Sequence, residues 1–245
     1  DPDLLREQLR DYRALVGHLD AQIDRILAAL DATGQRDNTL VVFAADHGLA
    51  LGSHGLLGKQ SLYEHSMRAP VILAGPGLPA GSVRHDLAYL LDLHETILAA
   101  TAPPLSPGEE APAPAEFARD LLPVARGEAT GREEVYLAYA DGQRALVTAK
   151  DKLIRLPQID RSLWFDLHGD PHELTPTAIA AERRAALTER LQAWERTRGT
   201  NLPWTADKLL PAELDLTGKR WPPDRWQPQW ILDKFFPAGG QASRK

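Results

Sequence analysis

The 245-residue chain contains no cysteine, which excludes disulfide bonds, thiolate metal sites and cysteine nucleophiles within it. It has no long apolar run either, because the longest, Leu40 to Ala45, falls far short of the roughly 20 residues that span a bilayer. Basic charge is not in excess, since 28 lysines and arginines face 34 aspartates and glutamates. These absences predict a soluble protein with no membrane segment and no broad basic surface for nucleic acid.

What is present is the composition of a globular protein, with 43% hydrophobic and 25% charged residues. The length predicts one large domain or two small ones. The first residues, Asp1-Pro2-Asp3, are charged and show no secretory signal.

The first hundred residues alternate between helical and strand-like patterns. Apolar residues between Leu4 and Thr33 recur at the spacing of one helical face, and Gly34 is a natural stop. Residues 39–45 form a continuous β-rich apolar run, typical of a strand covered on both faces, and residues 70–74 form a second such run. Further helices are predicted over residues 61–66 and 87–100. This order predicts an α/β layer with two parallel strands.

The second half has a different pattern. Strand-like segments are predicted at 135–139, 144–149, 152–156 and 163–167, and a helix over 178–198 with Ile179, Leu187, Leu191 and Trp194 on one side. Gly142 and the pair Lys150-Asp151 are expected to form hairpin turns. The predicted fold class is therefore α/β, followed by a small antiparallel α+β subdomain. We expect the α/β part of the chain to span residues 1–130, including a proline-rich loop over 102–116, and the small subdomain to span residues 131–198. An irregular tail rich in tryptophan and proline is expected over 199–245.

An α/β layer with two strands is too thin to cover its own helices, because a sheet usually has about four to six strands. The sequence is therefore expected to be the C-terminal part of a larger protein.

The residues that carry chemistry cluster after the first strand. Asp46 and His47 follow its carboxyl end, where open α/β sheets bind ligands. A glycine-rich loop with His54 and Lys59 comes next. A carboxylate and an imidazole suit a divalent cation, and an ammonium can neutralise charge on an anionic ester. Taken singly, Asp46-His47 could form only a turn, Lys59 could be solvated, and His54 could bond loop backbone.

Together these residues form a recognisable motif. Residues 37–59 read DNTLVVFAADHGLALGSHGLLGK, which resembles type I sulfatases of the alkaline phosphatase superfamily, whose pattern is approximately D-N-T-x-V-V-F-T-S-D-H-G-x-x-L-G-x-H-G-x-x-x-K. The continuation LYEHSMRAPVI over residues 62–72 is similar to the same family's next segment. Further matches are Asp92-Leu93, Thr96, Trp164 to Leu167, Asp170-Pro171 and Glu173. The predicted fold thus becomes the C-terminal part of an alkaline-phosphatase-like α/β sandwich.

The resemblance implies a sulfuric ester hydrolase. Such enzymes use a formylglycine nucleophile, made from Cys or Ser in a C/S-x-P-x-R motif, and a calcium ion that orients nucleophile and sulfate. By position, Asp46 and His47 match metal ligands, Lys59 matches a sulfate-contacting lysine, and His54 lies in the recurrent motif as a further catalytic candidate. The implied substrate is a sulfated small molecule or glycan. His65 is expected to be structural.

The sequence also departs from the family. It has no cysteine and no S-x-P-x-R motif, and the family's N-terminal metal ligands would lie upstream of Asp1. The polypeptide alone is therefore expected to be inactive, with the missing N-terminal half of the domain as its partner and calcium, manganese, magnesium or zinc as the metal. Many sulfatases are exported, which favours a periplasmic or extracellular parent, although cytosolic members exist.

Two other functions stay open. His47 beside Asp46 resembles iduronate and choline sulfatases but also phosphonate monoester hydrolases, so a phosphonate or phosphodiester hydrolase is the enzymatic alternative. Manganese or zinc would mark it, since imidazole suits those ions better than calcium. The third interpretation is a non-catalytic protein, either a sulfatase-like binding module or one subunit of a complex whose other chain carries the nucleophile.

Overall fold

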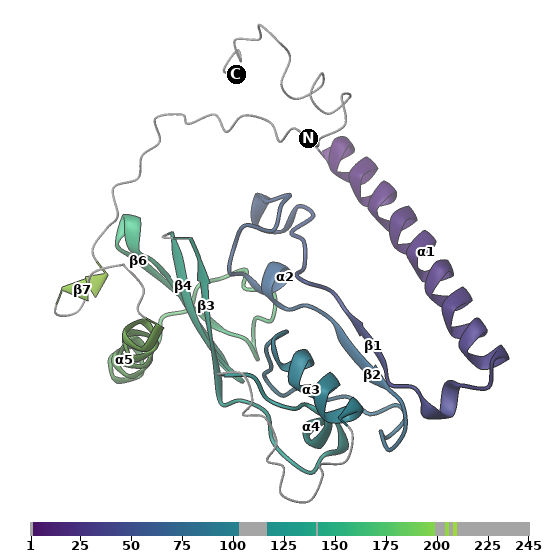
Figure 1. Ribbon diagram of the computed structural model, residues 1–245. Coiled ribbons are helices and arrows are strands. Elements are labelled where there is room, and N and C mark those ends of the chain that lie inside the picture. Colours follow the sequence, from purple (N-terminus) through teal and green to yellow (C-terminus); the bar gives the residue numbers. More distant parts are fainter. Residues whose placement is uncertain (1, 103–116, 141, 199–203, 206–207, 210–245) are drawn as a thin grey trace, which may run out of the picture. The chain divides into compact units, whose positions relative to one another are not determined.

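The computed structural model describes residues 2–102, 117–140, 142–198, 204–205 and 208–209 (Figure 1). All of these belong to one compact unit, Asp1–Ala212. Most of the predicted proline-rich loop, residues 103–116, and almost all of the predicted tail over 199–245 lie outside the described residues.

The long first helix is confirmed. Helix α1 spans Pro2–Ala32, and Gly34 follows it with a positive φ of 67° that glycine adopts easily. No residue of α1 is buried, and its apolar stripe includes Leu15 and Ile26, each 68% exposed. The apolar stripe of α1 is therefore left without a covering layer among the described residues.

The two predicted strands exist, but the expectation that they run parallel is wrong. Strand β1, Val41–Ala44, pairs with β2, Val71–Ala74, in antiparallel register, with Val41 opposite Ala74 and Ala44 opposite Val71. The connection contains only short helices, so the chain turns back beside β1 rather than crossing over the sheet as a parallel pair requires. The expectation that these strands are covered on both faces is also wrong for the described residues, because Ile72 on β2 is 58% exposed.

Short helices connect these elements. They are the 3₁₀ turns η1, Arg36–Asn38, and η2, Ser53–Gly55, and the one-turn helix α2, Glu64–Met67. Helix α2 overlaps the short helix predicted over residues 61–66 but begins three residues later. Helix α4, Leu122–Arg126, was not predicted. Pro123 in its first turn and Gly127 after its end are nevertheless usual helix-terminal signals.

The helix predicted over residues 87–100 begins later than expected, because α3 spans Asp92–Thr101. The Asp92 carboxylate accepts a hydrogen bond from the Tyr89 N–H at 2.7 Å, which holds the preceding residues in a turn. Leu87 instead forms an isolated antiparallel bridge with Arg132.

The second half forms the predicted antiparallel sheet. Its strands lie in the order β3-β4-β5-β6, and their bounds are Glu134–Tyr139, Gln143–Thr148, Asp151–Leu156 and Arg161–Asp166. The 3₁₀ turn η3, Pro157–Ile159, connects the last two. Helix α5, Ala181–Arg198, follows, and two short strands, β7 at Trp204–Thr205 and β8 at Lys208–Leu209, pair antiparallel.

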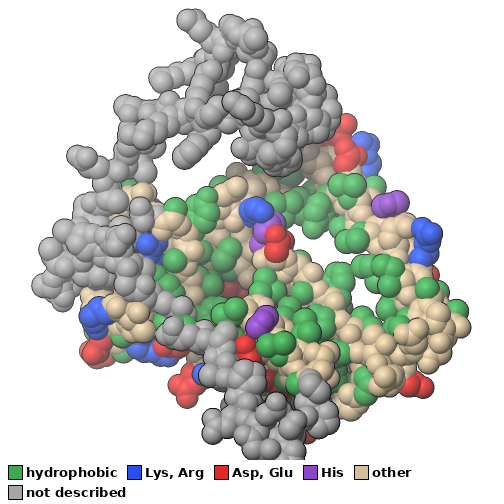
Figure 2. All heavy atoms as spheres, viewed as in Figure 1, with side chains coloured by type: hydrophobic (Ala, Val, Ile, Leu, Met, Phe, Trp, Pro, Cys, Tyr) green, Lys and Arg blue, Asp and Glu red, His purple; other side chains and the backbone are tan. Residues whose placement is uncertain are grey.

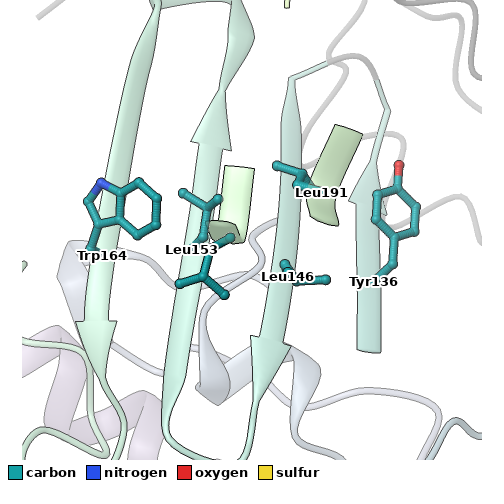
Figure 3. Close-up of a cluster of buried hydrophobic side chains, with 6 residues drawn as sticks. Tyr136, Leu146, Leu153, Trp164 and Leu191 are labelled. Carbon is teal, nitrogen blue, oxygen red and sulfur yellow. The ribbon is translucent and has the colours of Figure 1, made fainter. Parts of the chain in front are cut away.

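Each face of the four-stranded sheet has its own core, because successive side chains on a strand point to opposite faces. One core packs against α5 and contains Tyr136, Leu146, Leu153, Trp164, Leu187 and Leu191 (Figure 3). Ile179 and Trp194 pack against it, as the predicted helix face requires. The other core contains Leu62, Ala145, Ile154, Leu163 and Phe165. The sheet thus holds α5 on one face and the segment around Leu62 on the other.

Among the helices that the structure describes, none combines the length and the apolar character that crossing a bilayer needs.

Candidate active site

The Asp46-His47 pair lies directly beyond β1, and its backbone is held against the residues of α2. The Gly48 N–H donates a hydrogen bond to the Ser66 carbonyl at 2.8 Å. A Cβ on Gly48 would overlap the His65 carbonyl oxygen, so the close approach requires glycine here. The close contact of Gly48 with α2 therefore holds the backbone of Asp46 and His47 in place at the end of β1.

The hydrogen bonds of His47 determine which ring nitrogen is available. Its Nδ1 lies 2.8 Å from the Gly48 carbonyl oxygen, which can only accept, so Nδ1 carries the proton. In the neutral ring, Nε2 then carries the lone pair that can accept a hydrogen bond or bind a cation, and it lies 3.3 Å from Oδ2 of Asp46. The Asp46 side chain is 82% exposed. A carboxylate oxygen and an imidazole lone pair thus lie together at the protein surface.

Lys59 meets this pair from the glycine-rich loop. Its Nζ is in hydrogen-bonding contact with Nε2 of His47. Because the ammonium can only donate, Nε2 accepts, which agrees with the tautomer set by Gly48. Figure 2 shows basic, histidine and acidic side chains adjoining one another among hydrophobic side chains. The structure therefore brings three of the four predicted site residues together.

Asp46 and His47 offer two donor groups of the kinds found in metal sites. In metal sites, a histidine commonly donates its second ring N–H to a carbonyl, as His47 does to Gly48. Within the described part of the chain, however, no group of three His, Cys, Asp or Glu side chains could hold a metal ion. Calcium takes six to eight oxygen ligands, so Asp46 and His47 would need further ligands from elsewhere.

His54 has a different set of contacts. It lies in η2 with a positive φ of 54°, and its ring stacks on Tyr63 with centroids 4.0 Å apart. Its Nε2 lies 3.1 Å from the His172 carbonyl oxygen. These contacts are with the 61–67 segment and the loop after β6, so a catalytic role for His54 stays a prediction.

His65 completes this ring cluster. Its centroid is 5.4 Å from that of His54, and its Nδ1 lies 2.9 Å from Oγ of Ser66, which in turn lies 3.1 Å from Oγ of Ser61. Its Nε2 is buried and has no hydrogen-bond partner among the described residues. Burial lowers the pKa of His65, and His54 and Lys152 lower it further. The ring is therefore neutral at neutral pH.

The sequence analysis missed one charged residue near the site. Lys152 is fully buried on β5, where its ammonium lies between Glu64 and Glu173. It shares a sheet face with the core residue Ile154, two positions away, and that alternation was the available signal. Burial raises the pKa of Glu173, while the Lys152 ammonium acts in the opposite direction.

Comparison with known proteins supports the resemblance. Residues 1–102 match the family model described as Sulfatase. The N-acetylglucosamine-6-O-sulfatase of Bacteroides thetaiotaomicron is 30% identical over 207 residues, which cover 79% of this chain and 36% of that relative. The chain spans about two fifths of the length of the curated relatives it matches.

Solved structures agree. The structure of BT4656 in complex with its substrate D-glucosamine-2-N,6-O-disulfate aligns with a TM-score of 0.66 and 27% identity, covering 77% of this chain and 40% of that one. A phosphonate monoester hydrolase from Silicibacter pomeroyi aligns with a TM-score of 0.60 and 27% identity, covering 77% of this chain and 42% of that one. The chain therefore belongs to the sulfatase and alkaline-phosphatase-like superfamily, and the predicted fold class is confirmed.

Proposed function

We propose that this chain is part of a sulfuric ester hydrolase, to which Asp46 and His47 supply two metal ligands and Lys59 a contact to the sulfate group. The observation that carries the proposal is the meeting of these three side chains beyond β1, with Lys59 Nζ against His47 Nε2 and Asp46 Oδ2 3.3 Å from the same nitrogen. A carboxylate and an imidazole lone pair favour a divalent cation. An ammonium beside them can stabilise negative charge on the transferred oxygens.

The nucleophile and the remaining ligands are proposed to come from polypeptide outside this chain. Uncovered apolar side chains on the first half support this: Leu15 and Ile26 on α1 are each 68% exposed, and Ile72 on β2 is 58% exposed. The alignments cover only 43% and 36% of two relatives, and polypeptide matching the rest of those relatives would be available to cover these side chains. That additional polypeptide would carry the formylglycine nucleophile. Asp46 and His47 would help to hold a divalent metal, with calcium as the first candidate, which would supply positive charge beside the sulfate group.

The substrate class we propose is a sulfated small molecule or glycan. The related N-acetylglucosamine-6-O-sulfatase and the structure bound to a disulfated glucosamine support a sulfated sugar. The exposed position of Asp46 and Lys59 is compatible with a ligand that approaches from solvent.

The test is made on the natural protein isolated from its source. Peptide mapping of whatever precedes Asp1 is expected to find a C/S-x-P-x-R peptide carrying formylglycine, and the protein is expected to release sulfate from p-nitrophenyl sulfate or a sulfated sugar. A natural chain that begins at Asp1 and releases no sulfate would overturn the proposal and favour a non-catalytic, sulfatase-like binding module.

The second candidate is a phosphonate monoester or phosphodiester hydrolase of the same superfamily. The structural likeness to a phosphonate monoester hydrolase supports it, and so does the imidazole ligand, which suits manganese or zinc. Parallel assays with a sulfate ester and a phenylphosphonate ester separate the two candidates. Faster phosphonate hydrolysis together with manganese or zinc in the purified protein would replace the first proposal by the second.

A further inference from the structure

Two buried charged side chains, Lys152 and Glu173, meet the partly buried Glu64 where the small sheet packs against the segment that follows Lys59. Lys152 Nζ lies 2.9 Å from Oε1 of Glu64 and 2.9 Å from Oε1 of Glu173. The side chains of Lys152 and Glu173 are 0% and 1% exposed. Oε2 of Glu173 also accepts a hydrogen bond from the Glu64 backbone N–H at 2.6 Å. We call Glu64, Lys152 and Glu173 the charge cluster.

The cluster is connected to the candidate site through α2. Glu173 holds the first backbone N–H of α2, and the Ser66 carbonyl of the same helix accepts the hydrogen bond from Gly48. Gly48 directly follows His47. A short chain of bonded groups therefore runs from Glu173 to the Asp46-His47 pair.

A second connection reaches Lys59. The side-chain amide of Gln143 on β4 accepts a hydrogen bond from the Leu62 N–H at 3.0 Å and donates one to the Gln60 carbonyl at 3.4 Å. Gln60 directly follows Lys59. Both sides of the candidate site are thus attached to the same face of the same sheet.

Stability alone does not explain the charges. A buried ion pair is often no more stabilising than apolar side chains of similar volume, because removing charges from water is costly. The same sheet face already packs Leu62, Ile154 and Phe165 as an apolar core. Unlike an apolar side chain, the carboxylate of Glu173 makes directional contacts. It holds the Glu64 backbone N–H and the Lys152 ammonium at defined positions.

We infer that Glu173 is a positioning residue for the proposed sulfatase site: through the Glu64 amide it fixes α2, and through α2 it fixes the Asp46-His47 pair. The inference rests on the proposed function for the identity of the reaction. Glu173 does not touch substrate; it acts through the backbone that carries the ligands. Loss of this kind of supporting contact typically lowers activity or metal affinity by about 10-fold to 100-fold.

The experiment compares two buried glutamates in the complete natural protein. Glu173→Leu removes the positioning carboxylate. Glu195→Leu is the matched control, because Glu195 is also 1% exposed in its side chain and paired with an arginine, Arg144, but it lies on α5. Both variants are expected to lower the melting temperature, and only Glu173→Leu is expected to lower kcat by about tenfold or more at temperatures where both are folded. Glu173→Gln, which keeps an oxygen acceptor for the Glu64 N–H, is expected to recover much of the loss.

A readout independent of activity is the hydrogen exchange of the Gly48 amide. It is expected to speed up at least fivefold in Glu173→Leu and to change less than twofold in Glu195→Leu. If the natural protein hydrolyses no sulfate ester, the proposed function fails, and this exchange measurement still decides whether Glu173 positions the strand end. Equal loss of kcat in both leucine variants, or unchanged Gly48 exchange in Glu173→Leu, overturns the inference. Should Glu173→Leu not fold, Glu173→Asp, which withdraws the carboxylate from the Glu64 N–H, is measured against the same criteria.

Discussion

The two halves of the described chain differ in how much apolar surface they cover for themselves. In residues 1–102, α1 buries no side chain, and Val71 and Ile72 on β2 are 41% and 58% exposed. In the small sheet, Leu146 and Leu153 are 0% and 1% exposed. The second half has a complete core on both sheet faces, whereas the first half has apolar faces that nothing in the described chain covers.

The comparison matters because the candidate site belongs to the less covered half. Asp46, His47 and Lys59 all precede residue 60, yet the segment directly after Lys59 packs into the core of the small sheet. The small sheet therefore supports the part of the chain that contains the candidate site.

The largest expected effect is on stability, in the covered half. Leu153→Ala is expected to reduce the free energy of unfolding by about 3 kcal/mol, because it leaves a cavity in a packed core. Leu15→Ala on α1 is expected to change it by less than about 0.5 kcal/mol in this 245-residue chain. Urea denaturation of both variants, in this chain and in the complete protein, measures the difference. If additional polypeptide covers α1, Leu15→Ala is expected to lower the free energy of unfolding of the complete protein more than that of this chain. Equal losses for both variants in this chain would contradict the claim that the small sheet has the better covered core.

The second prediction concerns turnover. Lys59→Ala in the complete protein is expected to lower kcat/KM for a sulfate ester by more than about tenfold, because it removes charge stabilisation of the transferred oxygens. The melting temperature is expected to stay within about 1 °C, since Lys59 is exposed. Lys150→Ala, an exposed lysine on the turn between β4 and β5, is the control. Unchanged kinetics for Lys59→Ala would remove this residue from the mechanism.

The third prediction concerns the metal. Asp46→Asn is expected to lower the affinity of the complete protein for its divalent metal by about tenfold, because a neutral amide replaces a charged ligand. Elemental analysis after dialysis against a series of metal concentrations measures the change. Asp37→Asn, in the exposed turn η1, is the matched control. Metal content that is identical in wild type and Asp46→Asn would show that Asp46 is not a ligand.

Much of the fold could be predicted, because local periodicity decides it. The helical spacing between Leu4 and Thr33 predicted α1, and strand-like segments separated by turn residues predicted the four strands of the small sheet. The pairing direction of β2 could not be predicted, since an apolar run carries no information about its partner. The start of α3 was also hidden, because it depends on the Asp92 side chain bonding the Tyr89 N–H.

For the candidate site too, the sequence indicates some of the residues, whereas their contacts appear only in the fold. Asp46, His47 and Lys59 stand out in the sequence as residue types suited to a cation and an anion, but only the fold shows Lys59 in contact with His47. Lys152 was missed because a lysine in a strand is expected to be solvated, and its two carboxylate partners lie 88 and 21 residues away in sequence. The two-residue spacing from Ile154 indicates that Lys152 faces the core, but no local pattern identifies its two carboxylate partners.

The smallest expected effect is a pH dependence that links the two halves. The pKa of His65 is lowered from 6.5 by burial and by His54 and Lys152, so the folded protein binds this proton less tightly than the unfolded chain does. The free energy of unfolding is therefore expected to fall as the pH drops below about 6.5 and the unfolded chain becomes protonated first. His65→Asn, which cannot be protonated, is expected to show a shallower decline between pH 7 and pH 5 in urea denaturation. The same slope in both proteins would mean that the acid sensitivity arises elsewhere, and that His65 does not report the contact between the site-bearing segment and the small sheet.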